Sequence, residues 1–214
     1  MHHLTKGDDS TIYLVGIVKG LTSEGDRIGK IVEEIDFDIG ALPISREELK
    51  ALEDYTLEEE KDEYQLTTPE IAYARNLEKF GQVEIPPPSY ISLLSYCKKE
   101  GKEIRGLDMD DEHYTMAYCE HVSGTNWLMQ SFREKRLMKK KVDAKDPRKF
   151  ALKWDRIINR LSGYKELEEH REQVIAKNLK RFAKKGVLFA VIEFERLEGV
   201  IENFDLEVWS HKDI

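Results

Sequence analysis

Apolar runs rich in β-branched residues alternate along the chain with segments whose apolar residues recur at helical spacing. The predicted strands are residues 11–18 (TIYLVGIV), 37–44 (FDIGALPI), 103–107 (EIRGL) and 187–192 (VLFAVI). Short apolar runs of this kind are typical of strands that are covered on both faces. Between the strands, spacings such as Ile175, Leu179 and Phe182 place apolar side chains on one helical face. This alternation predicts an α/β domain whose largely parallel sheet is flanked by helices.

Terminus signals support the same order of elements. Ser45 and Glu48 form a capping box, which predicts a helix that begins at Arg46. Gly101 and Gly186 each follow an amphipathic segment with lysines in its last turn, as is typical of helix C-termini.

The length of 214 residues favours one domain. We expect residues 1–10, with His2 and His3, to form a disordered N-terminus and residues 11–214 to form the single α/β domain. A helical insertion over about 114–164 interrupts the domain before the last helix-strand unit and breaks at Asp146-Pro147. Residues 206–209 predict a further strand at the sheet edge.

Composition indicates the class of protein. Charged residues make up 36% of the chain, above the usual share of about 25%, and a surface rich in Lys and Glu is typical of thermophiles. Cys97 and Cys119 are the only cysteines. No signal peptide and no apolar run of about 20 residues is present, so we expect a cytoplasmic protein that does not enter a membrane.

Charge is distributed unevenly along the chain, whose net charge is −8. Residues 46–64 are mostly acidic and residues 133–156 mostly basic, which favours complementary surfaces within one molecule or across a homodimer. Pro43, which suits a strand near an edge, and the C-terminal segment FDLEVW also favour a homodimer. The run from Lys139 to Lys141 lacks interleaved aromatic residues and therefore does not indicate a nucleic-acid site.

Candidate site residues gather at one edge of the predicted sheet. In a doubly wound sheet, ligands bind beyond the carboxyl ends of the strands. The segments expected at that edge are residues 16–20, residues 43–45, Asp108, residues 193–196, and Arg171 at the opening of the last long helix.

Five segments carry these residues in order. They are GIVK ending at Lys19, Leu42-Pro43-Ile44, PPPSYISLLSYCKKEGKEIRGLD ending at Asp108, HREQVIAKNL containing Arg171, and ExxRxxG at Glu193, Arg196 and Gly199. Their order and spacing resemble the TraB/PrgY family, which is related to erythromycin-esterase-like and ChaN-like domains, over nearly the full chain. Members of that family have GTxH, a VEL-like segment, a strand ending in aspartate, ERDxxMAxxL and GxxHxxG.

The resemblance implies the fold but not the proposed activity of related metal-dependent peptide hydrolases. Lys19 and Arg196 stand where the family has histidines, and the glutamate of the second strand is missing. Lysine and arginine cannot replace imidazole and carboxylate as metal ligands, so we expect neither a metal nor another cofactor. His113, Cys119 and His121 would lie on different faces of a helix and do not complete a metal site.

Our leading hypothesis is a catalytically degenerate domain, a pseudoenzyme that acts as a binding or regulatory protein for a small anionic ligand or peptide. Its pocket would be electropositive, with Lys19, Arg171 and Arg196 around Asp108 and Glu193.

Three alternatives remain open at the level of sequence. An active hydrolase would use Asp108 and Glu193 as acid and base, with Arg171 and Lys19 holding an oxyanion. A purely structural partner protein would have no pocket at the strand ends. Arg171 could also serve structurally, as the partner of Asp108 or Glu193.

Overall fold

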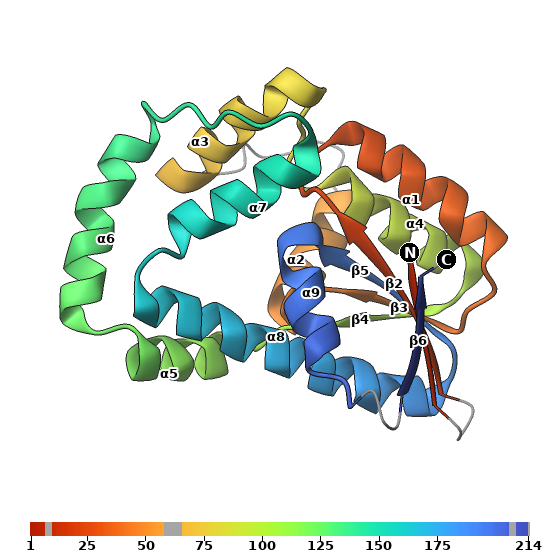
Figure 1. Cartoon of the computed structure of the whole chain (residues 1–214). Coiled ribbons are helices and arrows are strands. Elements are labelled where there is room, and N and C mark those ends of the chain that lie inside the picture. The colour runs from red at the N-terminus through yellow and green to blue at the C-terminus, as the bar shows by residue number, and fades with distance from the viewer. Residues whose placement is uncertain (7–9, 58–65, 206–208, 214) are drawn as a thin grey trace.

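The computed structural model describes residues 1–6, 10–57, 66–205 and 209–213 of the chain. Its six strands form one sheet in the order β4-β3-β5-β2-β1-β6 (Figure 1). They are β1 (His2–Lys6), β2 (Thr11–Ile17), β3 (Ile39–Leu42), β4 (Glu103–Gly106), β5 (Leu188–Glu193) and β6 (Trp209–Asp213). β4, β3, β5 and β2 pair in parallel, whereas β1 runs antiparallel to both β2 and β6. The predicted α/β class with a largely parallel sheet is therefore confirmed.

Helices cover both faces of the parallel strands. One face carries α1 (Thr22–Glu34), α2 (Arg46–Leu57) and α4 (Pro88–Glu100), and the other carries α8 (Ser162–Phe182) and α9 (Phe194–Glu202). Along β5, Phe189 and Val191 pack on the first face and Ala190 and Ile192 on the second, and the whole strand is buried. β5 therefore reads as a continuous apolar run because helices lie on both sides of it.

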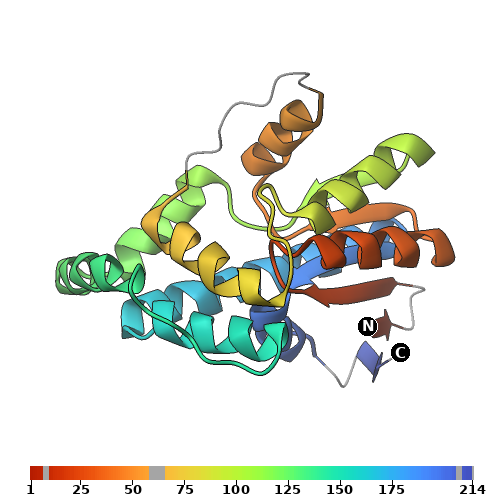
Figure 2. The same cartoon turned by 90° about the horizontal axis from the view of Figure 1, so that it is seen from above.

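The helical insertion builds separate cores beyond the sheet. It contains α5 (Asp111–His121), α6 (Gly124–Leu137) and α7 (Pro147–Ile158). α6 and α7 associate with α3 (Thr68–Leu77) and a 3-10 turn at Glu78–Phe80, whereas α5 packs on α8. The expected break is present, because Asp146 caps α7 through the backbone N–H of Lys149 at 2.8 Å and Pro147 is its first residue. Figures 1 and 2 show α6 at the rim of the molecule, far from the sheet.

Two predicted helix signals are confirmed. The Ser45 Oγ accepts from the Glu48 N–H at 3.0 Å, and the Glu48 carboxylate accepts from the Ser45 N–H at 2.8 Å. Gly101 ends α4 in the left-handed conformation, at φ 66°. Among the described helices, none combines the length and apolar composition that a membrane span requires.

The prediction of a disordered N-terminus is wrong for His2–Lys6, which forms β1. Leu4 is fully buried in the core beneath α8 and α9, and β1 pairs with β2 on one side and β6 on the other. A five-residue strand with one large apolar side chain is too short to show a recognisable periodicity. Its stability comes from pairing with neighbouring strands, which its own sequence does not reveal.

The remaining strand predictions need smaller corrections. Pro43 directly follows β3, which lies between β4 and β5 rather than at an edge. The C-terminal edge strand is present as β6 from Trp209, while residues 206–208 lie outside the described ranges. The acidic stretch is helical as far as Leu57, and residues 58–64 also lie outside those ranges.

Candidate functional site

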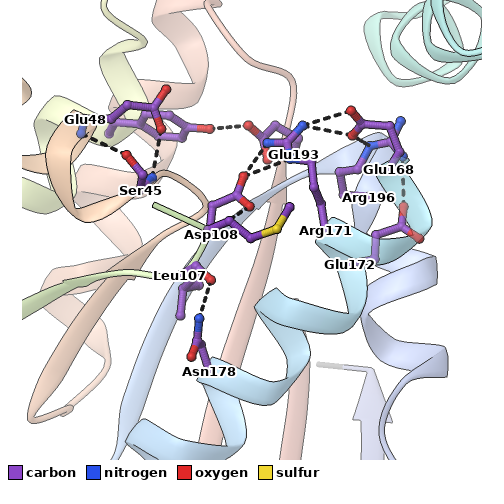
Figure 3. A network of polar contacts seen from close by, with 12 residues as sticks. Ser45, Glu48, Leu107, Asp108, Glu168, Arg171, Glu172, Asn178, Glu193 and Arg196 are labelled. Carbon is purple, nitrogen blue, oxygen red and sulfur yellow. Dashed lines mark hydrogen bonds and ion pairs between the residues drawn. The ribbon is translucent and has the colours of Figure 1, made fainter. Parts of the chain in front are cut away.

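Arg171 and Asp108 meet beyond the carboxyl end of β4 (Figure 3). The Arg171 Nε donates to Asp108 Oδ2 at 2.9 Å, and Nη2 donates to the same oxygen. The Oδ1 of Asp108 accepts from the N–H of Met109 at 2.8 Å, and the Asp108 N–H donates to the Ile44 carbonyl at 3.1 Å. Only 6% of the Asp108 side chain is exposed. Both carboxylate oxygens are therefore engaged.

Glu168 links this pair to a second arginine. It lies one turn before Arg171 on α8 and accepts from Arg171 Nη1 at 3.0 Å and 2.9 Å through its two oxygens (Figure 3). The Nε of Arg196 lies 3.6 Å from Glu168 Oε2. One carboxylate therefore stands between two guanidinium groups.

Arg196 is placed by the first turn of α9, and its other donors reach two further elements. Its Nη1 donates to Glu172 of α8 at 2.9 Å, and its Nη2 pairs with Asp155 of α7. A Cβ at Gly199, one turn later in α9, would overlap the Glu172 carboxylate. The absence of a side chain at Gly199 thus leaves room for the Glu172 carboxylate against α9.

Four carboxylates surround the two arginines Arg171 and Arg196. The four partners are Asp108, Asp155, Glu168 and Glu172. Burial alone would lower the pKa of the Arg171 guanidinium, but the charges of its carboxylate neighbours reverse this effect and hold the pKa well above its ordinary value. The expectation of an electropositive pocket is therefore wrong, since neither guanidinium is left without an anionic partner.

Glu193 has a different partner at the end of β5. Its Oε1 accepts from the Tyr90 hydroxyl of α4 at 2.6 Å, and both side chains are buried. Burial first, and the charge of Glu193 second, raise the pKa of the Tyr90 phenol well above its ordinary value. Tyr90 is therefore a hydrogen-bond donor that keeps its proton.

Glu195, in the first turn of α9, has a buried carboxyl group whose hydrogen bonding is incomplete. Its Oε2 is buried and forms no hydrogen bond with the described residues. Burial and the nearby charge of Glu193 raise the pKa of Glu195 to about 7, while the exposed Lys19 opposes the shift. Burial and the charge of Glu195 also raise the pKa of Tyr73, whose hydroxyl donates to the Lys19 carbonyl at 3.1 Å. Near neutral pH, Glu195 can therefore hold or release a proton.

A cavity of about 420 Å³ opens between α7, α8 and α9. Its lining includes network residues Glu168, Glu172 and Arg196, together with Glu195. Arg156 and Arg160 line it from the side of α7, and within the described ranges neither forms an ion pair. The cavity thus presents one carboxyl group and two guanidinium groups whose charges the described residues leave unmatched.

The structure brings some of the predicted site residues together and separates others. Arg171 contacts Asp108, one of the two partners considered, and it reaches Arg196 through Glu168. Glu193 bonds to Tyr90 instead, and Lys19 is exposed at the end of β2.

One placement was wrong. α8 begins at Ser162, so Arg171 lies in the middle of this helix rather than in its first turn. Residues 162–169 extend the helix past the edge of the sheet. The sequence did not predict this extension, because these residues have little apolar periodicity. This extension carries Glu168, which the sequence could have indicated by its spacing of three from Arg171. Asp155 and Tyr90 come from distant segments, and no local pattern marks them.

Metal ligands are not grouped in the described part of the chain. No three or more His, Cys, Asp and Glu side chains there are arranged to hold a metal ion. His113 instead lies with its Nδ1 2.6 Å from Asp110, and Cys119 is exposed.

Neither models of known protein families nor curated protein sequences match this chain. The resemblance to the TraB/PrgY family therefore stays a prediction that rests on the sequence motifs. The function has to be argued from the geometry of the site.

Proposed function

We propose that this chain is a catalytically degenerate, TraB-like α/β domain that acts as a binding or regulatory protein for a small ligand or peptide. The observation that carries the proposal is the closed ion-pair network. Asp108 pairs with Arg171, Arg171 also pairs with Glu168, and Arg196 pairs with Glu172. The candidate catalytic groups at the tip of β4 are therefore occupied, and the adjoining cavity is the place for a ligand.

The unmatched charges of the cavity define the class of ligand. Arg156 and Arg160 favour a carboxylate or phosphate, whereas ionised Glu195 favours an ammonium group. The volume of about 420 Å³ lies within the usual range for small-molecule sites. The anion expected from the sequence is therefore narrowed to a molecule that carries both charges, such as an amino acid or a peptide with free termini.

Thermal shift and calorimetry with matched peptides test this proposal. We expect a dialanine peptide with free termini to raise the melting temperature, and its acetylated and amidated counterpart to have no effect. Glu195→Gln and Arg160→Gln should each weaken the shift, whereas Glu198→Gln, at an exposed position of the same helix, should preserve it. No binding of either peptide at millimolar concentration would overturn the assigned ligand class.

The alternative is an active hydrolase with Asp108 and Glu193 as acid and base. It is weakened by the engagement of Asp108 with Met109 and Arg171 and by the separate bond of Glu193 to Tyr90. Esterase, phosphatase and peptidase substrates, with and without Mn²⁺ and Zn²⁺, decide between the two. Turnover that Glu193→Gln abolishes would reject the binding-protein proposal. A purely structural role would leave the cavity between α7, α8 and α9 without a ligand, so the peptide titrations also decide this alternative.

A homodimer is also part of this proposal. The sequence left its interface open between the insertion and the C-terminal segment.

A further inference from the structure

The helical insertion carries a large exposed apolar surface. Five apolar side chains on α5 and α6 are between 51% and 63% exposed. They are Met116, Trp127, Leu128, Met129 and Phe132. Soluble monomers rarely expose so many large apolar groups on adjoining helices, and such surfaces mark interaction sites. Figure 1 places both helices on the side of the molecule away from β1 and β6.

The orientation of α6 is fixed by polar contacts on its inner face. Arg133 Nη2 donates to the Ile157 carbonyl of α7 at 2.6 Å, and Gln130 is buried and donates to the Ile158 carbonyl at 3.4 Å. Leu137 is also buried on this side. The apolar outer face of α6 therefore cannot turn inward without breaking these contacts.

Unpaired charges of opposite sign flank the apolar surface. Exposed acids lie on α5 at Asp111, Glu112 and Glu120, and exposed bases lie at and beyond the C-terminal end of α6 at Lys135, Arg136 and residues 139–141. Within the described ranges, none of these side chains forms an ion pair. The length of α6, about 20 Å by its rise per residue, separates the two groups within one molecule.

We propose that the surface formed by α5 and α6 is a symmetric dimer interface that binds a second copy of this chain. A two-fold axis near Leu128 and Phe132 would set the two α6 helices antiparallel, so that the apolar side chains form the centre of the interface. The basic end of each α6 would then face the acidic α5 of its partner. The complementary charges that one molecule holds apart are thereby brought together at both ends of the interface.

An anionic membrane is the competing occupant, because a basic helix with exposed Trp, Leu and Phe can bind a bilayer surface. The acids on α5 argue against it, since Met116 shares that helix with Asp111, Glu112 and Glu120. The net charge of −8 would also repel the rest of the molecule from anionic lipid. A second copy of this chain would supply bases for the acids on α5 and acids for the bases at the end of α6.

Light scattering and sedimentation velocity at micromolar concentration test the proposal. We expect the wild type to have the mass of two chains, and Leu128→Glu and Phe132→Glu to raise the dimer dissociation constant by roughly 30-fold or more. Both positions are exposed, so circular dichroism should show an unchanged fold. Leu57→Glu, at a residue of α2 that is 74% exposed, is the matched control and should leave the dimer intact.

A charge exchange tests the antiparallel arrangement. Lys135→Glu should weaken the dimer, and adding Glu120→Lys in the same chain should restore it. A dimer that neither Leu128→Glu nor Phe132→Glu weakens would reject this interface. A wild-type mass of one chain would reject the proposal outright, and flotation of that monomer with phosphatidylglycerol vesicles would identify a membrane surface instead.

Discussion

The guanidinium of Arg171 donates from Nε to Oδ2 of Asp108 at 2.9 Å, across 63 residues of chain. This contact joins the middle of α8 to the tip of β4. Its removal would leave a carboxylate of which only 6% of the side chain is exposed without its cationic partner.

We predict that Arg171→Met lowers the free energy of unfolding by about 3 kcal/mol, because breaking one side of a buried ion pair leaves an uncompensated charge. Urea denaturation measures the loss. Lys177→Met, at an exposed position of the same helix, is the control and should change stability by less than about 0.5 kcal/mol. Equal losses in the two variants would mean that Arg171 contributes only as a solvated side chain.

Glu195 makes stability depend on pH. Its pKa is about 7 in the folded chain, above the ordinary value of 4.5 for a solvated glutamate, so between these values the folded state binds the proton more tightly than the unfolded state. The free energy of unfolding therefore falls as pH rises through this window, by roughly 3 kcal/mol for this group when complete. Glu195→Gln should remove that part of the slope between pH 5 and pH 8.

Denaturation midpoints at pH 5, 6, 7 and 8 measure the effect, with Glu198→Gln as the control on the same helix. The charged groups around Glu195 are Glu193, Glu168 and Lys19, and they remain in both variants. Parallel pH profiles for wild type and Glu195→Gln would show that Glu195 titrates as an ordinary exposed carboxyl.

The hydroxyl of Tyr90 stabilises the buried Glu193. Tyr90→Phe should cost about 1 to 3 kcal/mol, because the carboxylate loses its donor and stays buried. Tyr96→Phe is matched, since Tyr96 lies on the same helix and its hydroxyl forms no hydrogen bond with the described residues. Comparable unfolding curves for the two variants would argue against the Tyr90 bond.

Two helical glycines should respond oppositely to alanine. Gly199→Ala should destabilise by roughly 1 kcal/mol, because the new Cβ displaces the Glu172 carboxylate from its hydrogen bond with Arg196. Gly29→Ala in α1 meets nothing within 4 Å and should stabilise by about 0.5 to 1 kcal/mol through helix propensity. Melting temperatures that shift in the same direction would contradict the close contact between Gly199 and the Glu172 carboxylate.

Local sequence predicted the elements whose stability is encoded locally. The runs 11–18 and 187–192 are apolar on both faces, and the caps at Ser45 and Gly101 depend on neighbouring residues. β1 escaped prediction because Leu4 is its one large apolar residue and its pairing partners come from both ends of the chain.

The site was predictable in position but not in charge. Strand order brings Asp108 and Arg171 to one edge, and Asp108 was one of the two partners considered for Arg171. The sequence predicted an electropositive pocket because the motifs contain Arg171 and Arg196, whereas most of the carboxylates that pair with them lie outside the motifs. Asp155 comes from the insertion and Glu168 from a helix extension with weak periodicity. The balance of charge is therefore a tertiary property.

Glu168 belongs to two ion pairs at once, so the cavity and the tip of β4 are thermodynamically linked. A ligand group that pulls Arg196 away from Glu168 leaves Arg171 as the only partner of Glu168 among the two arginines. A change at the Arg171–Asp108 pair must then alter ligand binding by the same coupling free energy. Asp108, held by Arg171, lies two residues before Asp110, the N-cap of α5, whose outer surface we assign to the dimer. The dimer dissociation constant should therefore change with ligand concentration. By the same linkage, the ligand dissociation constant should change with protein concentration.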